Sequence, residues 1–123
     1  APYAQTGGRA LFDIEIFLEA FMVLPPAFRE KMLEAFRKDL TKNGEELAEA
    51  ILAGDDERTD HLAHSLKGIC LNVGAVAMVD RLTEIRSAPV DQRESCLIPL
   101  QDTITASLTA CDELYRTRVA QTQ

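Results

Sequence analysis

Hydrophobic side chains recur along most of this chain at steps of three, four and seven residues, which place them on one face of an α-helix. In the segment from residue 26 to residue 53 the pattern is carried by Phe28, Met32, Phe36, Leu40, Leu47 and Ile51. No run of alternating polar and apolar residues with a hairpin turn signal accompanies it. The pattern therefore predicts an all-α protein.

Prolines separate the first two predicted helices. The apolar segment 11–24 is stopped by Pro25 and Pro26, and the prolines also suit the first turn of a second helix that continues to Ala53. Gly44 lies inside this long segment and allows a kink or a break there. The sequence thus predicts a short N-terminal helix followed by a long amphipathic one.

Glycine and aspartate mark the two ends of the third predicted helix. Gly54 suits the position after a helix C-terminus, and Asp55 or Asp56 suits the N-cap of the next helix. The connection between the second and third helices is therefore expected to be tight. The third helix is predicted to run to Asn72 and to end at Gly74.

Two further helices complete the predicted fold. The fourth starts near Ala75 and ends before Pro89, and the last covers Asp91 to Val119, with a kink or a new start at Pro99. The inward-facing positions of these helices are Met78, Leu82, Ile85, Ile104, Leu108, Cys111 and Tyr115. Short connections favour antiparallel neighbours. We expect an antiparallel up-down-up-down four-helix bundle, with the short N-terminal helix capping one end.

Composition and charge exclude several classes of protein. A chain of 123 residues with 46% hydrophobic and 27% charged residues is typical of one soluble globular domain. Its formal charge of −7 argues against nucleic acid or an anionic membrane as the main partner, since both reward a basic surface. No apolar run approaches the ~18–20 residues of a membrane span, and no charged-then-apolar leader is present. We expect a cytoplasmic, monomeric protein.

The cysteines indicate neither disulfides nor zinc. Cys70, Cys96 and Cys111 are odd in number, widely spaced and without a C-x-x-C pair. They are most simply small buried hydrophobic residues in a reducing compartment.

The first ten residues differ in composition from the rest. They contain a Gly-Gly pair and lack an initiator methionine. This composition is typical of a linker, so residues 1–10 are predicted to be a linker or disordered. Residues 11–123 are then the helical domain. We expect either a domain cut from a longer chain or a processed stand-alone protein, since both would show this composition.

The third predicted helix has one polar face of special composition. Its apolar positions Leu62, Leu66, Ile69 and Val73 fall on one side. His64 lies roughly 190° from the centre of that stripe, and Lys67, Gly68 and Leu71 flank it. A glycine inside a helix costs about 0.8–1 kcal/mol relative to alanine, so its presence needs a reason other than stability. A nucleophilic imidazole, an ammonium group and a bare stretch of backbone thus share one surface.

The string "AHSLKGICLNVGA", residues 63–75, resembles the signature of histidine-containing phosphotransfer (HPt) domains, an H-x-L-K-G core followed by a Gly-Ala pair. The helix pattern from residue 12 to residue 119 is similar to that family's bundle. The resemblance implies that His64 accepts a phosphoryl group from an aspartyl phosphate on a receiver domain and passes it to another receiver. It also implies that Lys67 assists the phosphoryl group and that Gly68 leaves space for the receiver.

Some residues near this string are expected to be structural. The sequence departs from the family at Ile69 and Cys70, where small residues are common, but both should face the core. Gly74 and Ala75 are interpreted as a helix stop and a close-packed helix start rather than as residues with chemistry. Leu71, beside His64 on the wet side, is predicted to be the centre of a receiver-docking patch.

His61 and the arginines of the fourth helix allow two roles each. His61 and His64 form an H-x-x-H pair that could bind a metal, but no further ligand except Asp60 is placed with them, so no metal site is predicted. His61 is instead assigned to partner docking. An antiparallel turn near residue 74 brings Arg86 within reach of a phosphoryl group on His64, although a surface ion pair is the simpler role for this arginine and for Arg81.

The leading functional prediction is a phosphocarrier module of a multistep phosphorelay. Imidazole is partly neutral at physiological pH, so it can attack phosphorus without a dedicated base. No ATP-binding glycine motif is present, so the module is predicted not to be an enzyme, unless it is excised from a hybrid sensor histidine kinase. The expected partners are receiver domains and such a kinase. No cofactor of its own is predicted; Mg²⁺ is expected on the receiver.

The sequence leaves three alternatives open. The first is an interaction module that binds and sequesters a receiver without transfer, although the presence of both His64 and Lys67 argues against it. The second is a metal-binding bundle, which lacks the expected carboxylates and histidines on facing helices. The third is a helical partner that dephosphorylates a receiver and leaves no stable phosphohistidine.

Overall fold

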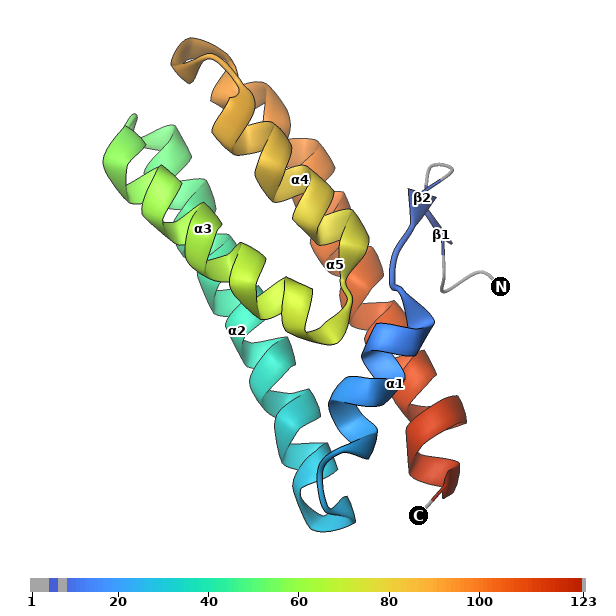
Figure 1. Ribbon diagram of the computed structural model, residues 1–123. Helices are drawn as coiled ribbons and strands as arrows, with labels where there is room; N and C mark the ends of the chain where they lie inside the picture. The colour runs from blue at the N-terminus through green and yellow to red at the C-terminus, as the bar shows by residue number, and fades with distance from the viewer. Residues whose placement is uncertain (1–4, 7–8, 123) are drawn as a thin grey trace.

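The structure, a computed structural model, describes residues 5–6 and 9–122 (Figure 1). The described residues contain five α-helices: α1 (Ile14–Met22), α2 (Pro26–Leu52), α3 (Asp56–Val73), α4 (Val76–Ser87) and α5 (Leu97–Leu114). The 3-10 helix η2 (Val90–Cys96) precedes α5, and the π-helix η3 (Tyr115–Val119) and the 3-10 turn η4 (Ala120–Thr122) follow it. The prediction of an all-α protein with a short N-terminal helix is confirmed.

Extended pairing in the described part of the chain is limited to two short strands near the N-terminus. The strands β1 (Gln5–Thr6) and β2 (Arg9–Ala10) pair in antiparallel fashion. Residues 1–4 and 7–8 of the predicted linker lie outside the described residues. The assignment of residues 1–10 to a linker therefore stays a prediction.

Four helices lie side by side, and α1 covers one end of them. Each of α2, α3, α4 and α5 runs opposite to the helix before it (Figure 1). Contacts join α2 to α3, α3 to α4, α4 to α5 and α2 to α5. Because a tight turn joins α2, with 27 residues, to α3, with 18, the other end of α2 extends beyond α3. There α1 packs against α2, α3 and η3. We call the part containing α3 and α4 the four-helix half, and the part containing α1 the α1 half.

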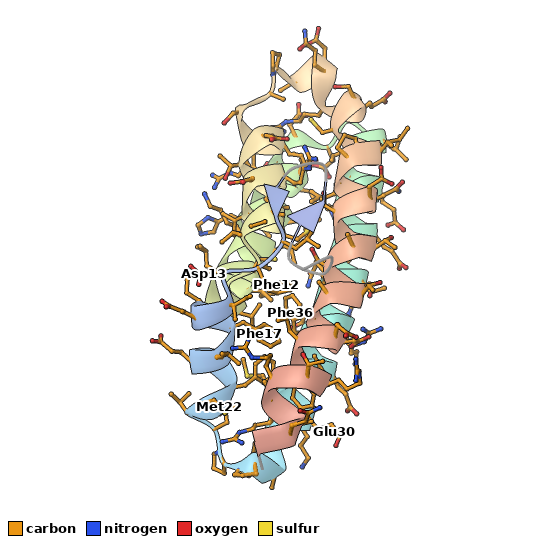
Figure 2. All side chains as sticks on the ribbon, turned by 90° about the vertical axis from the view of Figure 1, so that its right-hand side faces the viewer. Phe12, Asp13, Phe17, Met22, Glu30 and Phe36 are labelled. Carbon is orange, nitrogen blue, oxygen red and sulfur yellow. The ribbon has the colours of Figure 1, made fainter. Side chains whose placement is uncertain are left out.

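Aromatic rings form the core of the α1 half. The ring centroids of Phe12 and Phe17 are 5.3 Å apart, and those of Phe12 and Phe36 are 6.4 Å apart. Phe21 continues the cluster to Phe17 at 4.7 Å and to Tyr115 at 5.5 Å. Figure 2 shows Phe12, Phe17 and Phe36 in the space between α1 and the long helices. Each such pair contributes about 0.5–1.5 kcal/mol beyond the area it buries, so this cluster fastens α1 to the bundle.

Gly74, which follows α3, lies against the start of α1. Its φ of 73° is the left-handed conformation that ends α3, as predicted. A Cβ there would lie 2.8 Å from the carbonyl oxygen of Asp13 and 2.9 Å from Cβ of Ile16, so a side chain has no room. The Asp13 amide donates to the Gly74 carbonyl at 2.8 Å, and the Asp13 carboxylate caps α1 at Ile16. Both the turn and the close approach therefore require glycine.

One expectation about the start of α2 is wrong. The spacing of hydrophobic residues places Phe28 on the apolar face of α2, but its side chain is 52% exposed, and the Lys31 ammonium lies 5.7 Å from its ring centroid. Arg29 is buried instead, because its guanidinium donates to the carbonyls of Phe21 and Leu24, each at 3.0 Å. These carbonyls lie where α1 ends and lack the amide of a following helical turn, although the Phe21 carbonyl also accepts from the Leu24 amide at 3.1 Å. Satisfying them outweighs burying the Phe28 ring at this end of the bundle.

Most of the remaining helix ends lie at the proline, aspartate and glycine residues predicted to mark them. Pro26 begins α2, and Asp55 caps α3 by accepting from the Arg58 amide at 3.1 Å. Helix α2 is continuous through Gly44, where a Cβ would lie 2.7 Å from Cδ1 of Ile104 in α5. Glycine at this point therefore allows α2 and α5 to approach closely. The predicted last helix is divided into η2 and α5, and Pro99 lies in the first turn of α5, which is a new start.

Candidate functional site

The exposed face of α3 carries the residues singled out from the sequence. Thr59, Leu62, Ala63, Leu66, Cys70 and Val73 are the buried residues of α3, while Ile69 is half-buried. His64 is exposed on the opposite side, together with His61, Gly68 and Leu71, and Lys67 is half-buried. The helix therefore presents the imidazole to solvent on a rigid, packed element.

No contact within the described residues requires glycine at position 68. A Cβ at this position would meet no atom within 4 Å, and its φ is not among the positive values of the described glycines. Alanine would therefore fit without strain and would favour the helix by about 0.8–1 kcal/mol. Nothing inside the described part of the molecule therefore requires the absence of a side chain at this position.

The turn at Gly74 brings α4 back along α3, so that Arg86 lies beside His64. Arg86 Nη1 is 3.4 Å from His64 Nδ1. Among the described residues Arg86 forms no ion pair. Arg81 does form one, with Glu84 at 3.1 Å, and also donates to the Thr103 hydroxyl. A guanidinium carries donors but no acceptor, so Arg86 presents positive charge and N–H groups to the ring.

A shallow pocket lies between α3 and α4 next to His64. Its volume is about 310 Å³, and it is lined by Asp60, Lys67, Thr83, Arg86 and Ser87. Two of its side chains, Lys67 and Arg86, are cationic. Asp60 is bound by Arg93 Nη2 at 2.7 Å, so its negative charge is partly neutralised there. The pocket thus holds two cationic side chains, one of which, Arg86, also contacts the His64 ring.

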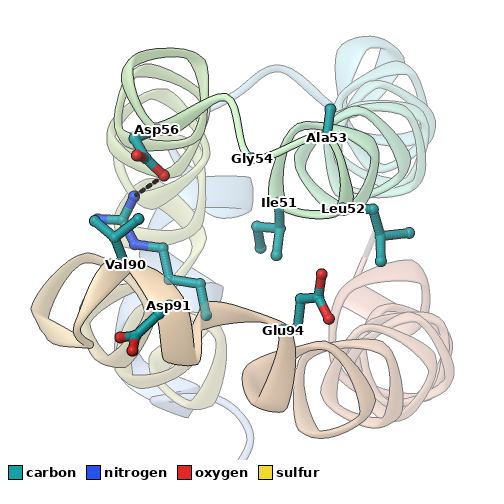
Figure 3. A pocket seen from close by; sticks show the side chains of 9 residues that line it. Ile51, Leu52, Ala53, Gly54, Asp56, Val90, Asp91 and Glu94 are labelled. Atoms are coloured by element: carbon teal, nitrogen blue, oxygen red, sulfur yellow. Dashed lines mark ion pairs between the residues drawn. The ribbon is translucent and has the colours of Figure 1, made fainter.

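Arg93 holds the start of α3 in place, and no sequence pattern predicts this role. Arg93 is buried; its Nε donates to the Ile85 carbonyl at 3.1 Å, and it pairs with Asp60 and, at 3.8 Å, with Asp56. It lines a second pocket of about 310 Å³ at the end of the bundle, together with Glu94 and other residues (Figure 3). A lone arginine in a polar segment carries no pattern that would reveal these contacts beforehand.

Two cysteines of the bundle are buried and un-ionised. Burial raises the pKa of the Cys70 thiol to about 12, and burial followed by the nearby Asp112 charge raises that of Cys111 to about 11. Cys96 is half-buried. Their interpretation as small hydrophobic residues agrees with this placement. No group of three or more His, Cys, Asp or Glu side chains arranged to hold a metal ion is found in the described part of the chain, His61 and His64 included.

The fold and the site define a class of protein: a helical bundle that exposes a histidine, His64, beside cationic side chains. A family model described as the Hpt domain matches residues 31–114, which is more than half of the chain. The chain therefore belongs to the Hpt domain family, whose members carry phosphoryl groups in two-component phosphorelays. No curated protein and no solved structure matches it. Within the described residues, no helix has the length and apolar character needed to cross a membrane.

Proposed function

We propose that this domain relays a phosphoryl group between aspartates of receiver domains through a phosphohistidine at His64. The observation that carries the proposal is the exposed imidazole on α3 with Arg86 at 3.4 Å and the side-chain-free Gly68 one turn further along. An attacking receiver needs open access to the ring, and Gly68 supports that access. The transferred group needs positive charge, and Lys67 and Arg86 supply it.

The proposed chemistry is an in-line displacement at phosphorus. A ring nitrogen of His64 donates its lone pair to phosphorus, while the P–O bond to the receiver's aspartate breaks and its electrons return to that carboxylate. The reverse reaction passes the group to a second receiver. Mg²⁺ bound by the receiver would neutralise charge from the other side. The carrier itself contributes the nucleophile, the orientation of the ring and the two cations.

Docking of the receiver is assigned to the exposed face around His64. Leu71 is 53% exposed, and no described packing requires it to be apolar there. With Gly68 and His61 it offers a small apolar surface that a receiver can cover. We expect the donor receiver to belong to a hybrid sensor histidine kinase, and we expect the carrier to act as a cytoplasmic monomer.

Radiolabel transfer tests the proposal directly. A receiver domain charged with labelled phosphate is mixed with the carrier, and the label should move to His64 in an acid-labile, base-stable form. The His64→Gln variant should accept none, because it lacks the nucleophile. The matched control His61→Gln should still accept the label.

Two results would contradict this assignment. Label that survives His64→Gln, or that is lost only in His61→Gln, would place the acceptor elsewhere. Receiver binding without any transfer would identify a sequestering module instead of a carrier.

A further inference from the structure

We propose that Arg86 is a positioning residue that keeps Nδ1 of His64 free of a proton, directs the phosphoryl group to Nε2 and slows its loss to water. The inference rests on the proposed function of His64. It starts from the 3.4 Å contact between Arg86 Nη1 and His64 Nδ1. The two residues are 22 positions apart, on α4 and α3, so the packing of the two helices creates the contact.

The chemistry of the two groups fixes the direction of this hydrogen bond. A guanidinium has N–H donors only and stays protonated in proteins. Nδ1 must therefore accept, and in a neutral imidazole the single N–H is then on Nε2. The contact occupies Nδ1. Nε2 is thus the nitrogen that can carry a phosphoryl group without displacing Arg86.

The same contact suits the phosphorylated ring. With the phosphoryl group on Nε2, the neutral ring keeps a lone pair on Nδ1, to which Arg86 can still donate. A proton on Nδ1 would weaken the P–N bond, because its cleavage would then release neutral imidazole instead of an imidazolate anion. In hydrolysis the oxygen of water bonds to phosphorus, the P–N electron pair returns to Nε2, and the protons of the water stay with inorganic phosphate. Arg86 opposes the protonated ring and thereby slows this reaction.

The other charged groups around the ring do not replace this contact. On α3, Asp60 is bound by Arg93 at 2.7 Å, and His61 and Lys67 lie within one turn of His64. On α4, Arg86 is the charged side chain that reaches the pocket next to the ring. Within the described residues no carboxylate hydrogen-bonds to the ring. The neighbourhood therefore supplies Nδ1 with a donor and not with an acceptor.

Transfer to a receiver places the opposite demand on Nδ1. When the carboxylate of the receiver forms its P–O bond, the P–N pair again returns to Nε2, and a proton on Nδ1 again helps the ring to leave. Arg86 must therefore release Nδ1 when a receiver docks, and its guanidinium can then contact the phosphoryl oxygens in the adjoining pocket. The phosphoryl group is thus stable on the free carrier and is transferred when a receiver docks.

Nitrogen NMR of the unphosphorylated protein tests the first step. In the neutral ring of His64 the proton should be on Nε2, and Arg86→Gln should raise the fraction with a proton on Nδ1, because a glutamine oxygen can accept from it. Arg81→Gln is the matched control, since it removes one positive charge from α4 at a side chain that does not contact His64. A ring mainly protonated at Nδ1 in the unmodified protein, or one that Arg86→Gln leaves unchanged, would overturn the proposal.

The lifetime of the phosphohistidine tests the second step. The protein is phosphorylated with phosphoramidate, the donor is removed, and the loss of label is followed at neutral pH. Arg86→Gln should lose it about threefold to tenfold faster, the range expected for one exposed hydrogen bond to a charged group. Arg81→Gln should match the unmodified protein, and Arg86→Lys, which also only donates, should restore part of the lifetime.

The dependence on pH separates this role from a merely structural one. At about pH 10, Nδ1 of the phosphorylated ring has no proton in any variant, so the difference between Arg86→Gln and the unmodified protein should disappear. Equal lifetimes at neutral pH, a difference that persists at high pH, or phosphorus attached to Nδ1 in the NMR spectrum would each overturn the proposal.

Phosphoramidate also distinguishes this inference from the relay function, because a small donor needs no receiver. A label on Nε2 with an Arg86-dependent lifetime that passes to no receiver would overturn the relay and support the role of Arg86. A label that passes freely to receivers but has the same lifetime in Arg86→Gln would overturn the role of Arg86 alone.

Discussion

The four-helix half and the α1 half use their polar side chains in opposite ways. In the α1 half the buried Arg29 is fixed by backbone carbonyls, and the aromatic rings around Phe17 fill the interior. In the four-helix half His64 faces solvent, and the contact found for its ring is the long one to Arg86. The Hpt match begins at residue 31 and therefore leaves α1 out. We therefore expect α1 to contribute stability and the exposed face of α3 to contribute the proposed chemistry.

Helix lengths explain why the α1 half exists. The 27 residues of α2 span about 40 Å and the 18 residues of α3 about 27 Å, at 1.5 Å per residue. The nine residues of α1 span about 13 Å, which matches the difference. Without α1 the ring of Tyr115 would lose its partner Phe21. Phe12, which precedes α1 and packs on Phe17, covers the ring of Phe36. A short helix therefore completes a core that α3 is too short to cover.

The largest expected effect comes from removing the centre of the aromatic cluster. Phe17→Ala should lower the free energy of unfolding by about 3–5 kcal/mol, since the fully buried ring leaves a cavity. Urea denaturation measures the change, with the exposed Phe28→Ala as a matched control expected to stay within about 0.5 kcal/mol. At a temperature where Phe17→Ala is still folded, its phosphoryl-transfer rate should equal that of the unmodified protein. A folded but inactive variant would contradict the assignment of stability to one half and phosphoryl transfer to the other.

A smaller effect is expected from removing one cation of the four-helix half. Lys67→Ala should slow single-turnover transfer by about tenfold, or about 1.4 kcal/mol, because its charge is needed most while the phosphoryl group is in transit. Rapid-quench kinetics gives the rate, and titration with unphosphorylated receiver gives the affinity. The affinity should change little, and Lys42→Ala, an exposed lysine of α2, should change neither. Loss of binding with an unchanged rate would make Lys67 a docking residue instead.

The smallest effect concerns a glycine of α3. Gly68→Gln should raise the free energy of unfolding by about 0.5–1 kcal/mol, because the site is open and glutamine favours a helix. The same variant should transfer phosphate more slowly, since its side chain obstructs the receiver. Gly74→Ala is the matched contrast and should destabilise, because its backbone is left-handed and the space is filled. A Gly68→Gln variant that is more stable and equally fast would show that the missing side chain does not serve the partner.

Local signals were enough to predict most helix ends, but not the contacts of the arginines. Pro26, Asp55 and Gly74 mark ends because their backbone chemistry acts within one turn, and each lies at the predicted boundary. Arg29 and Arg93 were missed because a long side chain can reach carbonyls and carboxylates that are distant in sequence. Phe28 is exposed although its spacing fits the apolar face, because Arg29 occupies the buried position at this end of α2.

The site shows the same division. The phase of the α3 helix placed His64 on the exposed side, and the antiparallel turn brought Arg86 to its level, because both depend only on helical geometry. Which ring nitrogen Arg86 approaches depends on the rotamers of two side chains, and no sequence pattern encodes them. The roles of His64, Lys67, Gly68, Leu71, His61 and Arg86 remain predictions that the variants above address.

The hydrogen bond from the Asp13 amide to the Gly74 carbonyl, 2.8 Å long, gives the molecule a natural reporter of local opening. Asp13 lies just outside α1, so its amide is protected from exchange with deuterium only while α1 is docked on the end of α3. If α1 detaches as a cooperative unit, this amide will exchange faster than the amides in the middle of α3. Its exchange rate then measures how often the α1 half opens while the surface around His64 stays folded.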